Sequence, residues 1–154
     1  MSMTPLLDEV SRLHIPNAPA TPAQIEAFEK AAGWTLDPDL RAFYLHCDGA
    51  ILFERHDPAY RFLPLKEIRR GRVVILKDDT DKAGPADWYS ICEVRESNYI
   101  LLDVSHQENG CYPIRDGFRE MFPAPDYCPQ IAASFGAFLA GALRSKGRWF
   151  WLQP

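Results

Sequence analysis

Two kinds of apolar spacing divide this sequence, and they do not alternate. Up to residue 47 and again after residue 130, apolar residues recur at helical intervals, which is typical of amphipathic helices. Between residues 51 and 114 they form short runs separated by turn residues, which indicates strands. A doubly wound sheet would need strands and helices to alternate. The segregation therefore predicts an α+β fold, in which helices pack against a mainly antiparallel β-sheet.

Start and stop signals predict three helices in the first part of the chain. Thr4-Pro5 begins the first helix, with Thr4 as its N-cap. Thr21 begins the second with a capping box to Gln24, and Gly33 ends it. Asp37 caps the third. The apolar face of this third helix consists of Leu40, Phe43, Tyr44 and Cys47.

The strands are predicted in the middle of the chain. They are Ile51–Phe53, Tyr60–Leu63, Arg72–Leu76, Trp88–Val94, Tyr99–Asp103 and Cys111–Ile114. The polar segment 77–85 should form an exposed loop. Helical spacing returns at Ile131 and continues to Ala142, which predicts a closing helix of about 12 to 15 residues. The expected order is three helices, a β meander and a final helix, in one domain that spans residues 1–154.

The composition fits a folded domain and limits the classes of partner that it can bind. Of the 154 residues, 47% are hydrophobic, which suffices for one core. Apolar runs of about four residues are far shorter than the roughly 20 that span a bilayer. The N-terminus also lacks the apolar core of a secretory signal, so we expect a cytoplasmic protein that binds no membrane. The net charge of −4 opposes nucleic-acid binding and favours a basic protein partner.

The sequence carries no familiar catalytic motif. The G-x-S-x-G, Walker-type, dinucleotide-binding and H-E-x-x-H patterns do not occur. His46 and Cys47 offer zinc ligand types, as do His106 and Cys111, but no C-x-x-C pair accompanies them. In the acidic loop, Ala83 stands where a calcium site needs an oxygen ligand. We therefore expect no cofactor, no metal site and no enzymatic activity.

The cysteines and the aromatic C-terminus have structural interpretations. Cys47, Cys92, Cys111 and Cys128 are widely spaced in apolar settings. This favours buried, reduced thiols over disulfides, and over a nucleophilic cysteine paired with a histidine. The run Trp149–Leu152 could stack on single-stranded nucleic acid, but the acidic net charge favours a terminal strand or flap that covers the core. We expect a monomer, or a weak homodimer formed through this run.

The predicted helical hairpin carries a recognisable motif. It reads Thr21-x-x-x-Ile25-x-x-Phe28-Glu29-x-x-x-Gly33-x-x-Leu36, then Asp39-Leu40-x-x-Phe43-Tyr44-x-x-x-Asp48-Gly49. This resembles the opening signature of the SUKH superfamily, which contains yeast Smi/Knr-type cell-wall regulators and many bacterial immunity proteins. In that family a proline directly follows the leucine of the Gly-x-x-Leu step. Here the proline is Pro38, one position later, where it still fits the first turn of a helix.

Three further segments extend the resemblance in the correct order. Leu63–Ile68 resembles the short segment that follows a family strand, Asn98–Asp103 the central strand, and Ser134–Leu139 the closing helix. Together the similar segments cover about residues 21–140. The first predicted helix and the aromatic C-terminus lie outside the resemblance.

The resemblance implies a protein-binding function. Many bacterial members of the family inhibit polymorphic toxins, often nucleases or deaminases, by occluding them, and catalytic residues are not part of the signature. We therefore expect an immunity protein whose partner is a toxin domain. A general scaffold like the yeast regulators and a small-ligand-binding protein are the alternatives.

For the partner-binding surface the sequence offers polar and aromatic residues without an evident role in the core. They are Asp48, Glu54, Trp88, Tyr89, Glu96 and Asp103. Such a surface needs only preorganised aromatic anchors and charges. Structural alternatives exist, because Trp88 and Tyr89 could pack on the sheet and Asp103 could cap a turn.

Overall fold

The computed structural model describes residues 2–56, 59–95 and 98–152. Its helices are α1 (Thr4–Leu13), α2 (Pro22–Ala32), α3 (Pro38–His46), α4 (Gly71–Leu76) and α5 (Phe135–Arg144). Its short 3-10 helices are η1 (Leu65–Glu67), η2 (Asp81–Ala83), η3 (Pro125–Tyr127) and η4 (Phe150–Leu152). Its strands are β1 (Ile15–Pro16), β2 (Ala50–Leu52), β3 (Tyr60–Phe62), β4 (Arg69–Arg70), β5 (Trp88–Val94), β6 (Asn98–Asp103), β7 (Ile114–Gly117) and β8 (Gln130–Ala132). None of the helices in these ranges has the length and apolar character needed to cross a membrane.

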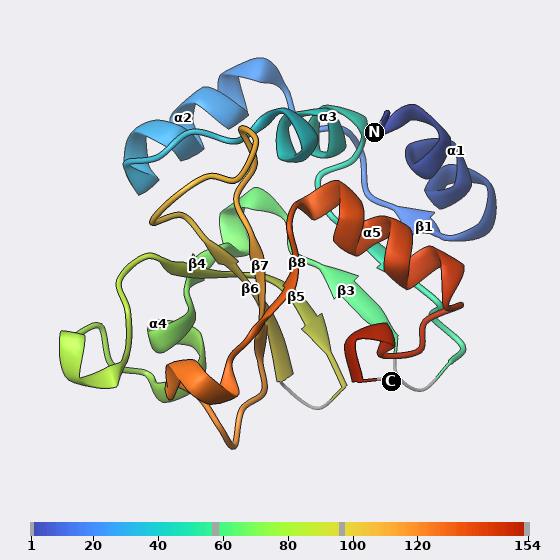
Figure 1. Cartoon of the computed structure of the whole chain (residues 1–154). Coiled ribbons are helices and arrows are strands. Elements are labelled where there is room, and N and C mark those ends of the chain that lie inside the picture. The colour runs from blue at the N-terminus through green and yellow to red at the C-terminus, as the bar shows by residue number, and fades with distance from the viewer. Residues whose placement is uncertain (1, 57–58, 96–97, 153–154) are drawn as a thin grey trace.

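The strands form one antiparallel sheet. Their order is β1-β2-β3-β5-β6-β7-β8, and β4 pairs with β5 beside this path. Figure 1 shows α1, α2 and α3 along one end of the sheet and α5 crossing in front of it. This architecture confirms the predicted α+β class with helices packed on an antiparallel sheet.

The helix signals act largely as predicted. Thr21 and Gln24 form the capping box, in which the Gln24 N–H donates to Thr21 Oγ1 at 3.1 Å and the Thr21 N–H donates to Gln24 Oε1 at 2.8 Å. Gly33 ends α2 in the left-handed conformation, with φ of 86°. Asp37 caps α3 by accepting a hydrogen bond from a backbone N–H. Thr4 is not an N-cap as predicted, because it is already the first helical residue of α1.

Residues 72–76 form α4, so the strand predicted there is wrong. β4 instead takes the position beside β5. The buried Arg72 guanidinium donates to Asp79 and Asp81 at 2.9 and 2.8 Å, which ties the following, largely exposed loop to the helix. Ile75 packs in an apolar cluster on the sheet. These tertiary contacts outweigh the strand propensity of the β-branched run.

Two further elements begin later than predicted. The strand expected at Cys111–Ile114 begins only at Ile114, because Cys111 lies in a turn and forms an isolated bridge with Glu108. The closing helix begins later than Ile131, which lies in β8. Its start is set by Ser134, whose side chain accepts a hydrogen bond from a backbone N–H of the first turn.

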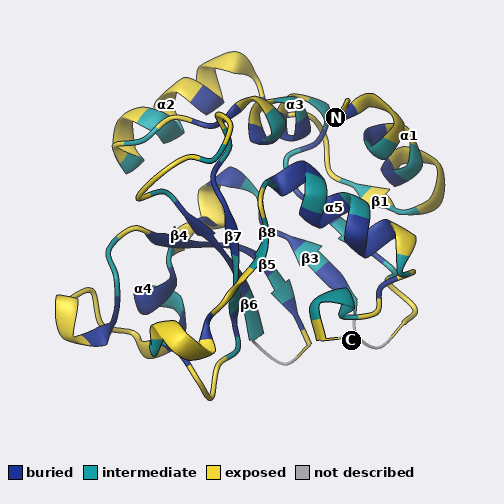
Figure 2. Ribbon diagram, in the orientation of Figure 1, coloured by how far each residue is buried: buried dark blue, intermediate teal, exposed yellow. Residues whose placement is uncertain are grey.

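The main core lies between the sheet and the helices α1, α3 and α5. Its central rings are Phe43, Phe62, Phe135 and Phe138, with centroids 4.9 to 6.2 Å apart. Figure 2 shows buried positions where α3 and α5 face the strands, whereas most of α2 is exposed. Phe28 of α2 is half-buried and packs against the edge of this core. A smaller cluster on the opposite face of the sheet contains Ile75, Trp88, Leu101, Phe122 and Cys128.

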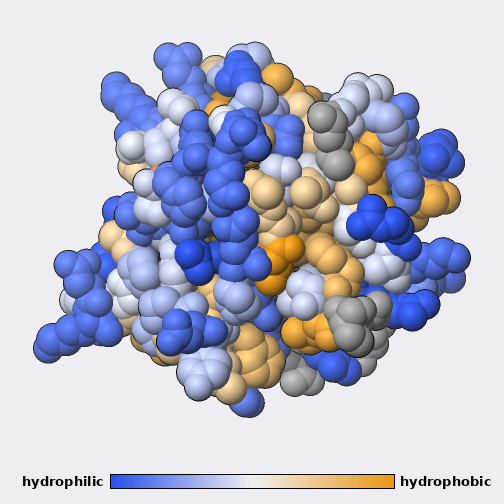
Figure 3. Space-filling view, viewed as in Figure 1, coloured by the Kyte–Doolittle hydropathy of each residue, from blue (hydrophilic) through white to orange (hydrophobic). Residues whose placement is uncertain are grey.

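The aromatic C-terminus covers the core as predicted, but as the 3-10 helix η4. Trp151 lies against Phe138 with ring centroids 5.7 Å apart, and its Nε1 donates to Asp116 at 3.2 Å. The Tyr60 hydroxyl donates to the Arg148 carbonyl at 3.1 Å. Figure 3 shows apolar residues over β8, α5 and this turn, with hydrophilic residues around them. The segment therefore completes the fold.

Candidate protein-binding site

Where β2, β3, β5 and β6 lie side by side, one face of the sheet carries partly exposed side chains. Because side chains alternate between the two faces of a strand, residues between core positions point away from the helices. The strand register places Ile51 opposite Arg61, Arg61 opposite Glu93, and Glu93 opposite Tyr99. All four residues are half-buried, and we call them the open row.

Arg61 lies between two carboxylates. Its Nε donates to Glu93 Oε1 at 3.2 Å, and a terminal nitrogen donates to Glu67 Oε1 at 3.0 Å. Burial lowers the pKa of Arg61, but the two carboxylates together outweigh burial and raise the pKa above its ordinary value. The Tyr99 hydroxyl donates to Glu93 Oε2 at 3.4 Å. The result is a preorganised group with one positive and two negative charges.

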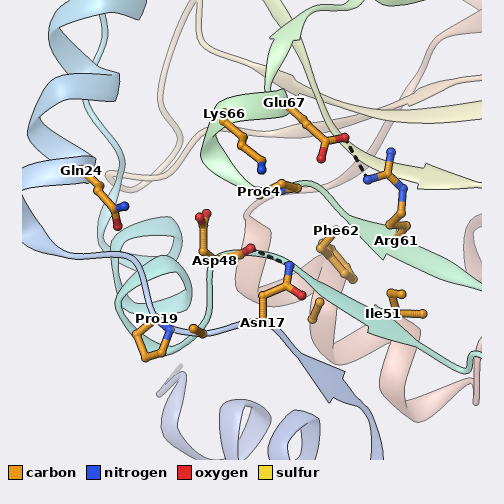
Figure 4. A pocket seen from close by; sticks show the side chains of 12 residues that line it. Asn17, Pro19, Gln24, Asp48, Ile51, Arg61, Phe62, Pro64, Lys66 and Glu67 are labelled. Carbon is orange, nitrogen blue, oxygen red and sulfur yellow. Dashed lines mark hydrogen bonds and ion pairs between the residues drawn. The ribbon is translucent and has the colours of Figure 1, made fainter.

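A cavity of about 530 Å³ adjoins the open row at Ile51 and Arg61. It lies between the segment that precedes α2 and the η1 region (Figure 4). Asp48 stands on its wall. The Asp48 carbonyl accepts from Asn17 Nδ2 at 2.8 Å, and Asp48 Oδ1 accepts from the Leu65 N–H at 2.8 Å. Asp48 therefore joins two loops and keeps a half-exposed carboxyl group beside the cavity.

Two of the residues predicted for the partner surface are at least half-exposed and lie at cavities near β2. Asp48 lines the cavity beside the open row. Glu54 is exposed and lines a separate cavity of about 230 Å³ with Phe53. Both cavities include Ile51, so the structure brings the two carboxylates to the same part of the sheet. Glu96 lies outside the described residues.

The other three predicted residues lie in the interior. Trp88 is 5% exposed, Tyr89 7% and Asp103 2%. Arg115 lies over the Trp88 ring at 5.0 Å and donates from Nε to Asp103 Oδ2 at 2.9 Å. Asp103 also accepts from the Ser105 N–H at 3.0 Å, which is the turn cap considered as its alternative. Contact of Trp88 or Asp103 with a partner would require the side chain to leave its present packing, whereas Tyr89, although buried, lines a cavity beside α2.

Sequence reasoning misses the open row, although it contains a signal. Arg61 and Glu93 are charged residues placed between two buried apolar neighbours, and that alternation is typical of a strand with one exposed face. The pairing of Arg61 with Glu67 could not be predicted from the alternation of residues along a strand. Glu67 belongs to η1, and only the folded chain brings it to β3.

The thiols are held in their protonated form. Burial raises the pKa of Cys47 to about 12 and that of Cys128 to about 11. Burial also raises the pKa of Cys111, with a further contribution from nearby aspartates. Since the thiolate is the nucleophilic form, these groups are poor nucleophiles near neutral pH. All four cysteines are free, and within the described ranges no three His, Cys, Asp or Glu side chains converge as metal ligands.

This fold and the ordered motifs define a family. Residues 19–141 match the model of the SMI1/KNR4 family, SUKH-1. The chain therefore belongs to this family, which confirms the resemblance drawn from the motifs. It is also similar to a particular relative, the immunity protein YokJ of Bacillus subtilis (strain 168). The two are 30% identical over 121 residues, which cover 77% of this chain and 71% of YokJ.

Proposed function

We propose that this protein is a cytoplasmic, non-enzymatic immunity protein that binds a toxin domain and blocks it. The observation that carries the proposal is the similarity to an immunity protein over most of both chains. The family match, over residues 19–141, includes the strands that form the open row. The function requires a binding surface and no catalytic group.

The open row and the adjoining cavity form a suitable surface for such a partner. Arg61, Glu67 and Glu93 are already oriented by hydrogen bonds, so little side-chain freedom is lost when a partner binds. Their excess of negative charge complements a basic surface. A toxin that acts on nucleic acid, as a nuclease or deaminase does, needs basic residues to hold phosphate groups. We propose a toxin of that type as the partner.

Co-expression with a neighbouring toxin gene tests the proposal. The toxin domain encoded beside this gene is expressed in a susceptible host, alone and together with this protein. We expect growth to be restored and the two proteins to copurify as a complex. Growth arrest that persists despite soluble expression of both proteins would show that this toxin is not its partner. Stable complexes with several cellular proteins, without any rescue, would favour the scaffold function instead.

A charge reversal in the open row tests the surface. Glu93→Lys should weaken binding about tenfold or more, equivalent to about 1.4 kcal/mol, because it places a second positive charge beside Arg61. Glu26→Lys is the matched control, since Glu26 is exposed on α2 and lines none of the described cavities. Equal protection by both variants, with unchanged thermal unfolding, would place the interface elsewhere.

A further inference from the structure

α2 is unusually exposed for a helix of a small domain. Ile25 is buried, while the other ten residues of its eleven are half-buried or exposed. Four of these, Gln24, Ala27, Phe28 and Ala31, line a cavity of about 400 Å³ between α2 and the η1–β4 segment. We call this cavity, with its continuation, the α2 groove. An apolar helix side left uncovered in this way is a common feature of interaction surfaces.

The α2 groove extends along the helix. A second cavity, of about 510 Å³, shares Phe28, Ala31 and Arg69 with the first, so the two are continuous. The buried side chains of Leu65 and Tyr89 contribute to the lining of the first and second cavities. One wall is thus formed by apolar residues of α2, and the two adjacent cavities together offer more room than a single side chain would fill.

The opposite wall is basic. Lys66 and Arg69 are exposed there, and neither forms an ion pair with a residue in the described ranges. Within the described part of the chain, the Arg69 guanidinium donates to the neighbouring Ile68 carbonyl alone, at 3.0 Å. Figure 4 shows Lys66 and Gln24 on opposite sides of the space beside Asp48. No carboxylate of α2 lines the groove. Asp48 lines its first cavity and Asp79 its second, where Asp79 is paired with Arg70 and Arg72, so that the cations outnumber the carboxylates along the groove.

This charge distribution is opposite to that of the protein as a whole. The net charge is −4, and the open row together with Glu67 carries two carboxylates for one guanidinium. Two unpaired cations beside an apolar wall therefore mark a local preference for a ligand with both carboxylates and apolar side chains. A nucleic acid fits less well, because two cations are few and the alanine-lined wall offers no partner for phosphate or sugar.

We propose that the α2 groove binds an acidic, apolar segment of the partner protein. The inference rests on the proposed protein-binding function, but it does not require that the partner be a toxin. The segment would place its apolar side chains against Ala27, Phe28 and Ala31 and its carboxylates against Lys66 and Arg69. Since the groove begins beside Asp48, the partner would meet an acidic and a basic surface side by side. That pattern fixes its orientation.

A peptide probe tests the groove on the full-length protein. The probe is a fluorescent helical peptide of about five turns with leucines on one face and glutamates on the other. We expect saturable binding by fluorescence anisotropy, with amide NMR shifts confined to α2, η1 and β4. The same peptide with lysines in place of the glutamates should bind at least tenfold more weakly. An RNA oligonucleotide of equal charge should not compete.

Two variant pairs identify the contacts. Lys66→Glu with Arg69→Glu should weaken binding of the acidic peptide about tenfold or more. Arg41→Glu with Lys82→Glu makes the same change of charge at exposed positions outside the groove and should leave binding unchanged. Ala31→Trp should fill the groove and block the peptide.

For Ala31→Trp, the control is Ala23→Trp at an exposed position of α2 that lines no described cavity. Equal binding of the acidic and basic peptides, NMR shifts outside the groove, or competition by the RNA would each overturn the inference. If the peptide binds as expected but no toxin is neutralised, the groove stands and the immunity function fails. The opposite result is also informative. If the native protein does not bind the peptide, and the Lys66→Glu, Arg69→Glu variant neutralises a toxin as well as the native protein does, the proposed groove is wrong and the immunity function stands.

Discussion

The two faces of β3 differ in what their side chains do. Tyr60 and Phe62 point into the main core and are 0% and 1% exposed, whereas the side chain of Arg61 between them is 40% exposed. Under the proposed function, successive residues of one strand serve two purposes, stability on one face and recognition on the other. The arrangement allows the recognition face to vary while the core face keeps the fold.

The recognition face does not extend over the whole sheet. At the start of β5, the same face is covered by α4 and the segment around Phe122. There Trp88 and Leu101 are buried together with Ile75. The part of this face near β2 and β3, where the open row lies, remains accessible to a partner. The difference explains why an aromatic residue in a predicted strand, such as Trp88, need not be a surface anchor.

The largest expected difference in the free energy of unfolding is between variants of two adjacent residues. Phe62→Ala removes a fully buried ring that packs against Phe43, Phe135 and Phe138, so it should lower the free energy of unfolding by about 3 to 5 kcal/mol. Arg61→Ala, on the other face, should cost less than about 1 kcal/mol. Urea unfolding of the two variants measures both values. Similar losses for the two variants would contradict the division of the strand into a core face and a recognition face.

A second comparison concerns the stability effects of substituting two glycines, one in a turn that approaches the sheet and one at an exposed helix end. Gly49 and Gly33 have similar left-handed φ angles, 88° and 86°. A Cβ at Gly49 would lie 2.6 Å from the Phe62 carbonyl oxygen, whereas a Cβ at Gly33 would meet no atom within 4 Å. Gly33→Ala should therefore cost about 1 kcal/mol from backbone strain alone. Gly49→Ala should cost about 3 kcal/mol or more, because strand β3 must also shift.

Thermal and urea unfolding of the two glycine variants provide the measurement. The similar backbone angles make each variant the control for the other. Equal destabilisation would mean that the approach of the Gly49 turn to β3 is loose. In that case the packing of the core face would tolerate more change at this turn than the distances indicate.

Local signals in the sequence were sufficient for much of the fold. The capping box at Thr21, the αL stop at Gly33 and the strand at Trp88–Val94 follow from residues close together in the chain. The helix α4 could not be predicted, because its β-branched residues favour a strand. What decides its structure is the contact of Arg72 with a loop that follows it. Short strands such as β4 likewise depend on the pairing partner that the rest of the fold supplies.

The candidate site was less predictable than the fold. Asp48 belongs to the Asp-Gly turn that follows the third helix, which the sequence shows, and the structure places it at a cavity. The grouping of Arg61, Glu67 and Glu93 requires knowledge of strand register and of the position of η1. Register is a property of pairs of strands, and a single strand sequence specifies only which residues share a face. Sequence alone therefore indicates the exposed face of a strand but not its neighbours.

The smallest expected difference in stability is between variants of a buried ion pair and of the more exposed ion pair in the open row. Burial raises the pKa of Asp103, but hydrogen bonds from Ser105 and Arg115 outweigh burial and hold the pKa below its ordinary value. Asp103→Asn should therefore cost about 2 kcal/mol near pH 7, since it removes a charge-assisted hydrogen bond in the interior. Glu93→Gln should cost less than about 1 kcal/mol, because Glu93 lies at a more exposed ion pair.

The pH dependence separates charge from shape at Asp103. A carboxyl group with a lowered pKa in the folded state stabilises the protein fully above its unfolded pKa, about 4, and loses this contribution as the pH falls through the folded pKa. The deficit of Asp103→Asn relative to the native protein should therefore shrink between about pH 5 and about pH 2. Urea unfolding across this range measures it. A deficit that stays constant would show that Asp103 acts through its shape and its hydrogen-bond geometry, and that the charge of its pair with Arg115 contributes no more than the exposed pair in the open row.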